Sequence, residues 1–162
     1  MRNEICRMEN LESLHKLRVL NIAKNRISKL ESLQYCQRLE KLIVANQRTK
    51  NSLKFDEDSL IGISQSLTYL DLENNRITAV EELAYLPYVE YLNLKENMLE
   101  SPLTMENALL CMKGLRTLFV DGNPLCKIEK WRDMVVMMAL NLQEINDKKI
   151  LVHEREFLFR LH

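Results

Sequence analysis

The stretch LTYLDLENN, residues 67–75, decides the fold. It has the pattern LxxLxLxxN, in which Leu70 and Leu72 alternate with polar neighbours. Alternation with a period of two predicts a short strand whose leucines face a core. The side-chain amide of Asn75 is suited to hydrogen-bonding backbone groups that the following turn leaves unpaired.

The same pattern occurs five times along the chain. The copies begin at Leu17, Leu39, Leu67, Val89 and Leu115, so the steps between them are 22, 28, 22 and 26 residues. Gln47 stands in the second copy where the others have Asn. Periods of this length with this pattern are typical of leucine-rich repeats. We therefore predict an α/β leucine-rich-repeat solenoid, with a curved parallel sheet on the concave face, short helices and turns on the convex face, and a C-terminal cap.

We predict a single domain, residues 1–162, with four parts. Residues 1–16 match a partial repeat, 17–121 the five repeats, 122–152 a cap and 153–162 a tail helix. The partial repeat lacks its strand, so either Met1 begins a truncated form or the chain belongs to a longer protein. We expect this open end to expose core residues, among them Ile5, Leu11 and Leu14, and to permit self-association.

Residues 122–126, GNPLC, are followed by Trp131-Arg132-Asp133, an apolar helix expected at 134–140, and LQEIND at 142–147. This order resembles the cap that closes leucine-rich-repeat proteins. The tail carries Phe157, Leu158 and Leu161 at helical spacing, and we expect it to dock on the cap; a partner-binding helix is the alternative.

The second and fourth repeats are long. Asp56 or Asp58 is placed to cap a helix over Leu60–Ser64. Thr104 is the expected cap of a second helix, stopped by Gly114, whose methionines we interpret as convex-side core rather than a binding stripe.

Lys+Arg and Asp+Glu are equal at 23 each. Zero net charge disfavours a nucleic-acid binder, although a local basic patch stays open. No apolar run is long enough to span a membrane, and no secretory signal begins the chain. We expect Cys6, Cys36 and Cys126 to be reduced core thiols of a cytoplasmic protein, a disulfide framework being the alternative.

Catalytic chemistry has no candidate in this sequence. The three histidines are far apart in a linear solenoid, and three glycines cannot build a phosphate loop. We therefore predict a chain that is not an enzyme, with no catalytic or metal site and no cofactor.

Strand alternation predicts which side chains point away from the core. Repeat positions three, five and seven form a concave face, apolar in its N-terminal half (Val19, Ala23, Ile43, Ala45). The C-terminal half mixes aromatic and charged residues, a composition common at binding hot spots. The predicted partner-binding residues are Ile43, Tyr69, Asp71, Glu73, Tyr91, Asn93, Lys95, Phe119 and Asp121.

Four segments resemble the testis leucine-rich-repeat proteins, a family of protein phosphatase 1 regulatory subunits. These segments are Val44–Arg48, the long second repeat with Phe55-Asp56 and Ser64–Leu67, the cap entry Asn123–Cys126 with Trp131–Asp133, and Glu154–Leu158. The resemblance covers nearly the whole chain, and its most specific feature is Asn46-Gln47-Arg48.

The resemblance implies binding to protein phosphatase 1 and association with microtubules, centrosomes or cilia. However, the short phosphatase-docking motif, a basic residue, Val or Ile, any residue, then Phe or Trp, is absent from the sequence. Two functions stay open: a phosphatase-regulatory adaptor, and a structural component of a cilium or axoneme that binds tubulin or dynein parts. An RNA-particle scaffold is disfavoured by the zero net charge.

Overall fold

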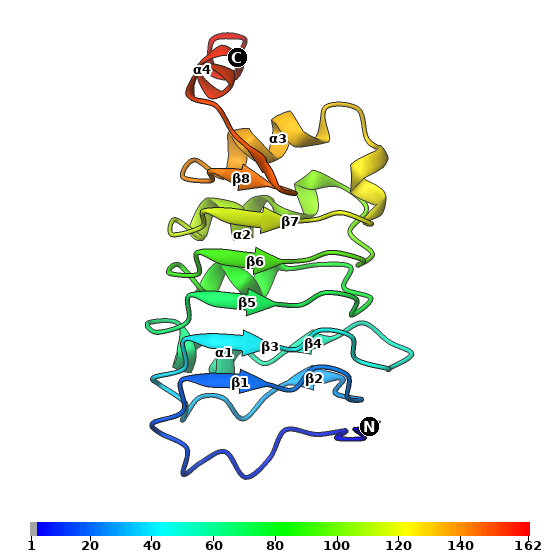
Figure 1. The fold of residues 1–162 in the computed structure, drawn as a ribbon, viewed down its shortest axis with the longest axis vertical. Helices are drawn as coiled ribbons and strands as arrows, with labels where there is room; N and C mark the ends of the chain where they lie inside the picture. Colours follow the sequence, from blue (N-terminus) through cyan, green and yellow to red (C-terminus); the bar gives the residue numbers. More distant parts are fainter. Residues whose placement is uncertain (1–2) are drawn as a thin grey trace.

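The computed structural model describes residues 3–162 and shows a stack of repeats (Figure 1). Seven strands form one sheet in the order β1-β3-β5-β6-β7-β8-β9, parallel up to β8, while β9 returns antiparallel. The strands are β1 Val19–Asn21, β3 Lys41–Ile43, β5 Tyr69–Asp71, β6 Tyr91–Asn93, β7 Thr117–Phe119, β8 Glu144–Ile145 and β9 Lys148–Lys149. The predicted α/β leucine-rich-repeat solenoid is confirmed.

Helices and turns cover the opposite side of the core from the open face of the sheet (Figure 1). The α-helices are α1 Glu57–Ile63, α2 Glu106–Cys111, α3 Trp131–Met138 and α4 Val152–Arg160. Three 3-10 helices add to them: η1 Glu81–Tyr85, η2 Pro102–Met105 and η3 Pro124–Lys127. Two short strands, β2 Lys29–Leu30 and β4 Lys54–Phe55, pair with each other in a second small sheet.

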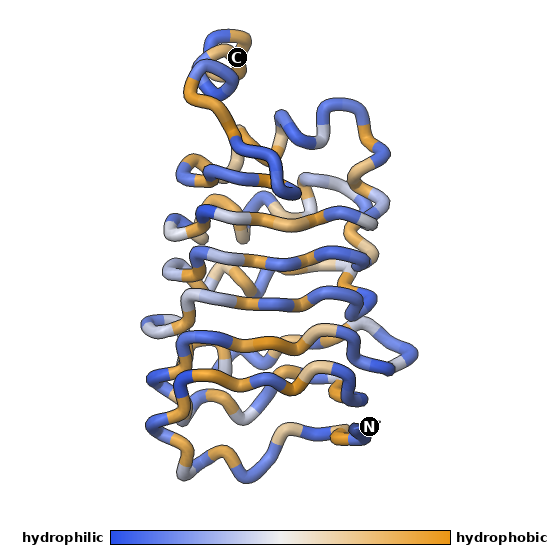
Figure 2. Tube along the Cα trace, in the orientation of Figure 1, coloured by the Kyte–Doolittle hydropathy of each residue, from blue (hydrophilic) through white to orange (hydrophobic). Residues whose placement is uncertain are grey.

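The parallel register places the same repeat position of each strand side by side. The central residues Leu20, Leu42, Leu70, Leu92, Leu118 and Ile145 are aligned from β1 to β8. From Leu42 onward all are nearly inaccessible to solvent. Apolar and polar residues alternate along the layers, and β1 and β3 are more apolar than β5 and β6 (Figure 2). One continuous core therefore holds the repeats together.

The residue that closes each strand is buried and bonded to the backbone of neighbouring repeats. Asn75 accepts from Gln47 N–H (3.0 Å) and donates to the carbonyls of Val44 and Leu72 (3.1 Å each). Gln47 has a longer side chain but also bonds to backbone groups, accepting from Ile27 N–H (2.9 Å) and donating to Val44 O. The predicted structural role of this position is confirmed.

The residue before each of these amides has a positive φ. The five are Lys24, Asn46, Asn74, Glu96 and Gly122, with φ between 53° and 74°. This left-handed conformation turns the chain out of the strand, and it favours Gly and Asn over residues with larger side chains. Three of the five repeats thus use a residue type that is common in such turns.

Several expected details are corrected by the structure. Thr104 does not cap the fourth-repeat helix, because it lies inside η2, which Ser101 caps and Pro102 begins. The α-helix α2 follows at Glu106 without a side-chain cap. Of the two predicted caps of the second-repeat helix, Asp56 and Asp58, the structure shows that Asp56 caps α1. Cys36 is buried and Cys126 partly so, but Cys6 is exposed, because its segment lies at the end of the described stack.

The cap differs from expectation in the extent of its helices. The apolar helix begins at Trp131, three residues earlier than predicted, and ends at Met138. In the tail helix α4 only Leu158 is buried, while Phe157 and Leu161 are each 61% exposed. Arg155 donates to the carbonyls of Val136 in α3 and of Ala139 and Leu142 after it. Glu154 also forms an ion pair with Arg132 of α3 (3.3 Å). The tail therefore docks through Leu158 and through the polar contacts of Arg155 and Glu154.

Candidate functional site

The open face of the sheet carries a row of three aromatic side chains from adjacent strands. Tyr69 and Tyr91 are directly opposite in the register of β5 and β6, and their rings stack with centroids 4.2 Å apart and planes 2° apart. Phe119 lies diagonally on β7, its ring tilted by 47° and 5.5 Å from that of Tyr91. We call Tyr69, Tyr91 and Phe119 the aromatic row.

Two lysines lie on the aromatic row, one at each end. The ammonium group of Lys41 is 4.3 Å from the ring centroid of Tyr69, and that of Lys95 is 4.5 Å from the ring of Phe119. Lys95 also lies 3.7 Å from the carboxylate of Asp121. The distances from Lys41 to the Tyr69 ring and from Lys95 to the Phe119 ring are both within the range of cation–π attraction, so the lysines hold the outer rings in place.

Short polar side chains at the middle of the open face bond to their own strands. Asp71 accepts from the backbone N–H of Glu73 (3.0 Å), and Asn93 accepts in the same way from Lys95 N–H (3.0 Å). Asn21 repeats this bond in β1, to Ala23 N–H. Asn93 also donates to the carboxylate of Glu73 (3.1 Å). These residues fix the ends of the strands as well as forming the surface.

Burial changes the ionisation of two groups on this face. The pKa of Asp71 is raised, chiefly by burial and further by the nearby carboxylate of Glu73, against the hydrogen bond from Glu73 N–H. The pKa of Tyr91 is raised, chiefly by burial and further by the neighbouring Tyr69 hydroxyl. The centre of the face thus holds a carboxyl group whose negative charge is poorly solvated.

The structure corrects the expected exposure of the candidate residues. Asn93 and Phe119 are only 5% and 8% exposed, because the neighbouring side chains of the face cover them. Tyr69, Tyr91 and Asp71 are half-buried. The remaining candidates, Ile43, Glu73, Lys95 and Asp121, are also of intermediate exposure. All nine lie on the same face of the sheet, as the alternation predicts.

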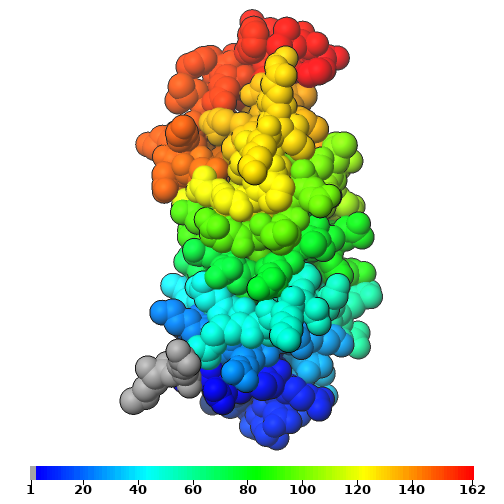
Figure 3. Space-filling model, turned by 90° about the vertical axis from the view of Figure 1, so that its right-hand side faces the viewer, coloured from blue at the N-terminus to red at the C-terminus, as the bar shows by residue number. Residues whose placement is uncertain are grey.

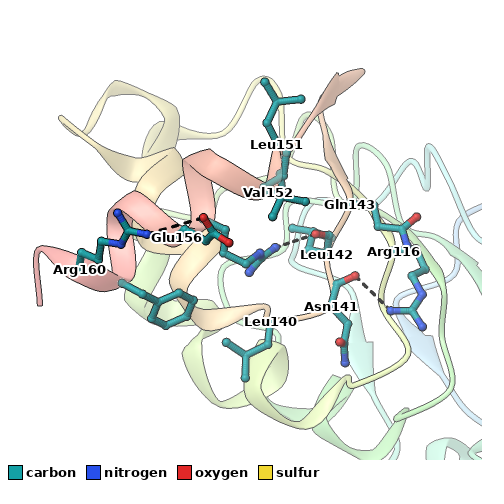
Figure 4. Close-up of a pocket in the computed structure, with 12 residues that line it drawn as sticks. Arg116, Leu140, Asn141, Leu142, Gln143, Leu151, Val152, Glu156 and Arg160 are labelled. Carbon is teal, nitrogen blue, oxygen red and sulfur yellow. Dashed lines mark hydrogen bonds and ion pairs between the residues drawn. The ribbon is translucent and has the colours of Figure 1, made fainter.

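A hollow lies at the C-terminal end, between the cap and α4 and away from the aromatic row (Figure 4). Its volume is about 600 Å³, and its apolar walls include Leu140, Val152 and Phe159. Arg116 lies at one rim and donates to the Asn141 carbonyl, while Arg160 lies at the other near Glu156. Sequence reasoning missed this hollow, because it depends on how α4 sits on the cap.

Among residues 3–162, no three His, Cys, Asp or Glu side chains are grouped to hold a metal ion. In the same described part of the chain, no helix is both long and apolar enough to cross a bilayer.

Comparison with known proteins agrees with this architecture. A family model described as leucine rich repeat matches residues 65–125. A chain of the Drosophila melanogaster SNF/U2A' complex is similar with a TM-score of 0.60 and 20% identity, over 99% of this chain and 78% of that one. An internalin from Listeria monocytogenes matches with a TM-score of 0.66 and 22% identity, over 88% of this chain and 38% of its own.

A leucine-rich-repeat protein of Leptospira interrogans matches with a TM-score of 0.67 and 21% identity. The match covers 88% of the present chain and 34% of the Leptospira protein. The present chain thus spans about a third of each bacterial protein. The repeats in the sequence, the stacked strands and these similarities together establish that the chain has the fold of the leucine-rich-repeat proteins.

Proposed function

We propose that this chain is a non-catalytic protein-binding scaffold whose partner lies on the open, concave face of the sheet. The observation that carries the proposal is the aromatic row, which crosses three strands and leaves the stacked rings of Tyr69 and Tyr91 partly open to solvent. Tyrosines held in place by their neighbours offer a large apolar area at a small entropic cost of binding. A repeat scaffold also presents an extended surface that suits a protein partner.

The charges around the row indicate the chemistry of the partner. Asp71, Glu73 and Asp121 lie on the same face as the row, and the lysines Lys41 and Lys95 are already in contact with aromatic rings. The poorly solvated carboxyl of Asp71 gains from a nearby cation. We infer a partner whose contact surface places Arg or Lys beside Asp71 and Glu73.

The finer proposal is a regulatory or targeting subunit of protein phosphatase 1 associated with microtubules or centrosomes. It is supported by the family resemblance of the long second repeat and the cap. Since the short docking motif is absent from the sequence, we propose that the phosphatase is held by the folded concave face. The alternative proposal is a structural component of a cilium or axoneme that binds tubulin or dynein parts through the same face.

The test is a calorimetric titration of the chain with protein phosphatase 1 catalytic subunit and, separately, with tubulin. We expect the Tyr69→Ala, Tyr91→Ala double variant to lose about 2–4 kcal/mol of affinity for the true partner, as truncated hot spots do. Phe119 is left unchanged, since it is buried and its removal would also disturb the sheet. The matched control is Glu82→Ala on the convex side, which should bind as the parent does.

Affinity capture from testis or ciliated-tissue lysate, with mass spectrometry, distinguishes the two finer proposals. We expect phosphatase catalytic subunit or axonemal proteins on the parent and on the Glu82→Ala control, and depletion of the same proteins on the double variant. If the double variant captures and titrates its partners as well as the parent does, the concave face is the wrong surface.

A further inference from the structure

The zero net charge of the chain conceals a strong separation of charge along the sequence. Residues 24–54 contain eight Lys or Arg and only two Glu, whereas residues 55–106 contain eleven Asp or Glu and two Lys or Arg. A solenoid preserves sequence order in space, so these blocks become separate regions of the molecule. The basic block includes the insertion that lengthens the second repeat.

The insertion is an ordered part of the fold, held by strand pairing, a buried leucine and backbone hydrogen bonds. Its strand β4 pairs with β2, aligning Lys54 with Lys29. Leu53 is buried in the core, and its N–H donates to the Asn75 carbonyl (3.1 Å). The N–H of Arg48 donates to Asn25 O (2.8 Å). These contacts place the insertion between the turns of the first and third repeats, in the cyan region of the lower half of Figure 3.

Seven cations therefore share one edge of the solenoid, where the strands end. We call Lys24, Arg26, Lys29, Arg48, Lys50, Lys54 and Arg76 the basic edge, and all seven are exposed. Two carboxylates oppose them: Glu4 lies 3.7 Å from Arg26, and Asp56 lies 3.5 Å from Lys29. Within residues 3–162, the other five form no ion pair, so the edge has a net positive charge.

We propose that the basic edge is a second docking surface, which binds a short acidic segment of a partner protein. It lies apart from the concave aromatic row and does not depend on what that row binds. The edge spans three repeats, about 10 Å along the solenoid at the usual spacing of strands. An extended segment rises about 3.3 Å per residue, so three or four residues with alternating carboxylates match that length.

The surroundings of the edge favour a short polypeptide over a long polyanion. The acidic block begins directly beyond it with Asp56, Glu57 and Asp58, so a nucleic acid or an anionic membrane extending past the edge would meet repulsion. Phe55, which follows Lys54 in the chain, packs against the core rather than offering a ring for bases to stack on.

The probe is a fluorescent eight-residue peptide of alternating Glu and Ser, compared with the same peptide carrying Gln for Glu. We expect the Glu peptide alone to bind, and to bind more weakly as NaCl rises from about 50 to about 200 mM, because exposed charges are screened. The variant Arg48→Glu, Lys50→Glu, Lys54→Glu should bind it about tenfold more weakly or worse.

The matched control reverses three exposed lysines elsewhere, Lys127→Glu, Lys148→Glu and Lys149→Glu, and carries the same net charge. We expect it to bind the Glu peptide within about twofold of the parent, and both triple variants to unfold at the parent's denaturant midpoint. Equal losses in both variants would show that only net charge acts, and would overturn the proposal. So would the absence of saturable binding by the parent. Tighter binding of an RNA duplex, or of vesicles containing phosphatidylserine, at the same salt would reject a protein segment as the partner.

Discussion

Replacing Asn97 with alanine should be the most damaging single change to the row of strand-closing amides. Its side-chain oxygen accepts from two backbone N–H groups, those of Asn75 and Ile77, both at 3.0 Å. The oxygen of Asn75 accepts from one, that of Gln47. All of these groups are buried, and water cannot replace the lost partner.

The carbonyls that Asn97 bonds keep other partners when the amide is removed. Leu72 O also accepts from the side chain of Asn75, and Leu94 O also accepts from that of Asn123. Lys95 O accepts from a backbone N–H. The cost therefore comes chiefly from the two N–H groups left without an acceptor.

An unsatisfied buried donor costs about 1–3 kcal/mol. Asn97→Ala leaves two such donors and should lower the free energy of unfolding by about 2–6 kcal/mol, whereas Asn75→Ala leaves one and should lower it by about 1–3 kcal/mol. Urea denaturation followed by circular dichroism measures both. The control is Asn107→Ala, an exposed change in α2 that should stay within about 0.5 kcal/mol of the parent. If Asn97→Ala costs no more than Asn75→Ala, or no more than the control, the reasoning is refuted.

Three further predictions concern single positions. Gly122→Ala should lower the thermal midpoint, at a cost of about 1–2 kcal/mol, because φ is +74° there and an added Cβ would meet the Glu96 carboxylate; an unchanged midpoint would contradict this. Asp71→Asn should stabilise the fold at pH 7. The pKa of the Asp71 carboxyl is raised in the folded state, so the free energy of unfolding falls as the pH rises from the ordinary Asp pKa through the pKa of folded Asp71, and Asn removes this loss. That gain should shrink as urea titrations are repeated toward pH 4, and a pH-independent gain would count against it. Val19, 55% exposed on the edge strand β1, should support self-association at micromolar concentration that Val19→Lys weakens; sedimentation showing a parent monomer at all concentrations would reject it.

The repeat pattern was sufficient to predict the stacked sheet, because each copy carries its own leucines and its own amide. Leu70 and Asn75 have the same environment as their counterparts in the neighbouring repeats, so a local pattern determines a long-range arrangement. Even the irregular Gln47 could be assigned to the amide row from its position alone, and its bonds to Ile27 and Val44 agree with that assignment.

What could not be predicted depends on contacts between side chains from different repeats. Alternation indicates that Phe119 points to the open face, but not that Tyr91 and Lys95 cover it. The amphipathic pattern of the tail suggests docking through Phe157, yet Arg155 forms the contact by bonding the end of α3. The pairing of β2 with β4 arises from an insertion that the repeat pattern does not describe.

Hydroxyl-radical footprinting of the chain, alone and in complex with the partner recovered by capture, tests the central claim most directly. Tyr69 and Tyr91 are half-buried on the open face, whereas Phe157 and Phe159 are exposed on α4, so all four should be labelled in the free chain. The account predicts that the partner protects the two tyrosines and leaves the two phenylalanines as reactive as before. Protection of Phe157 and Phe159 with unchanged labelling of Tyr69 and Tyr91 would contradict it.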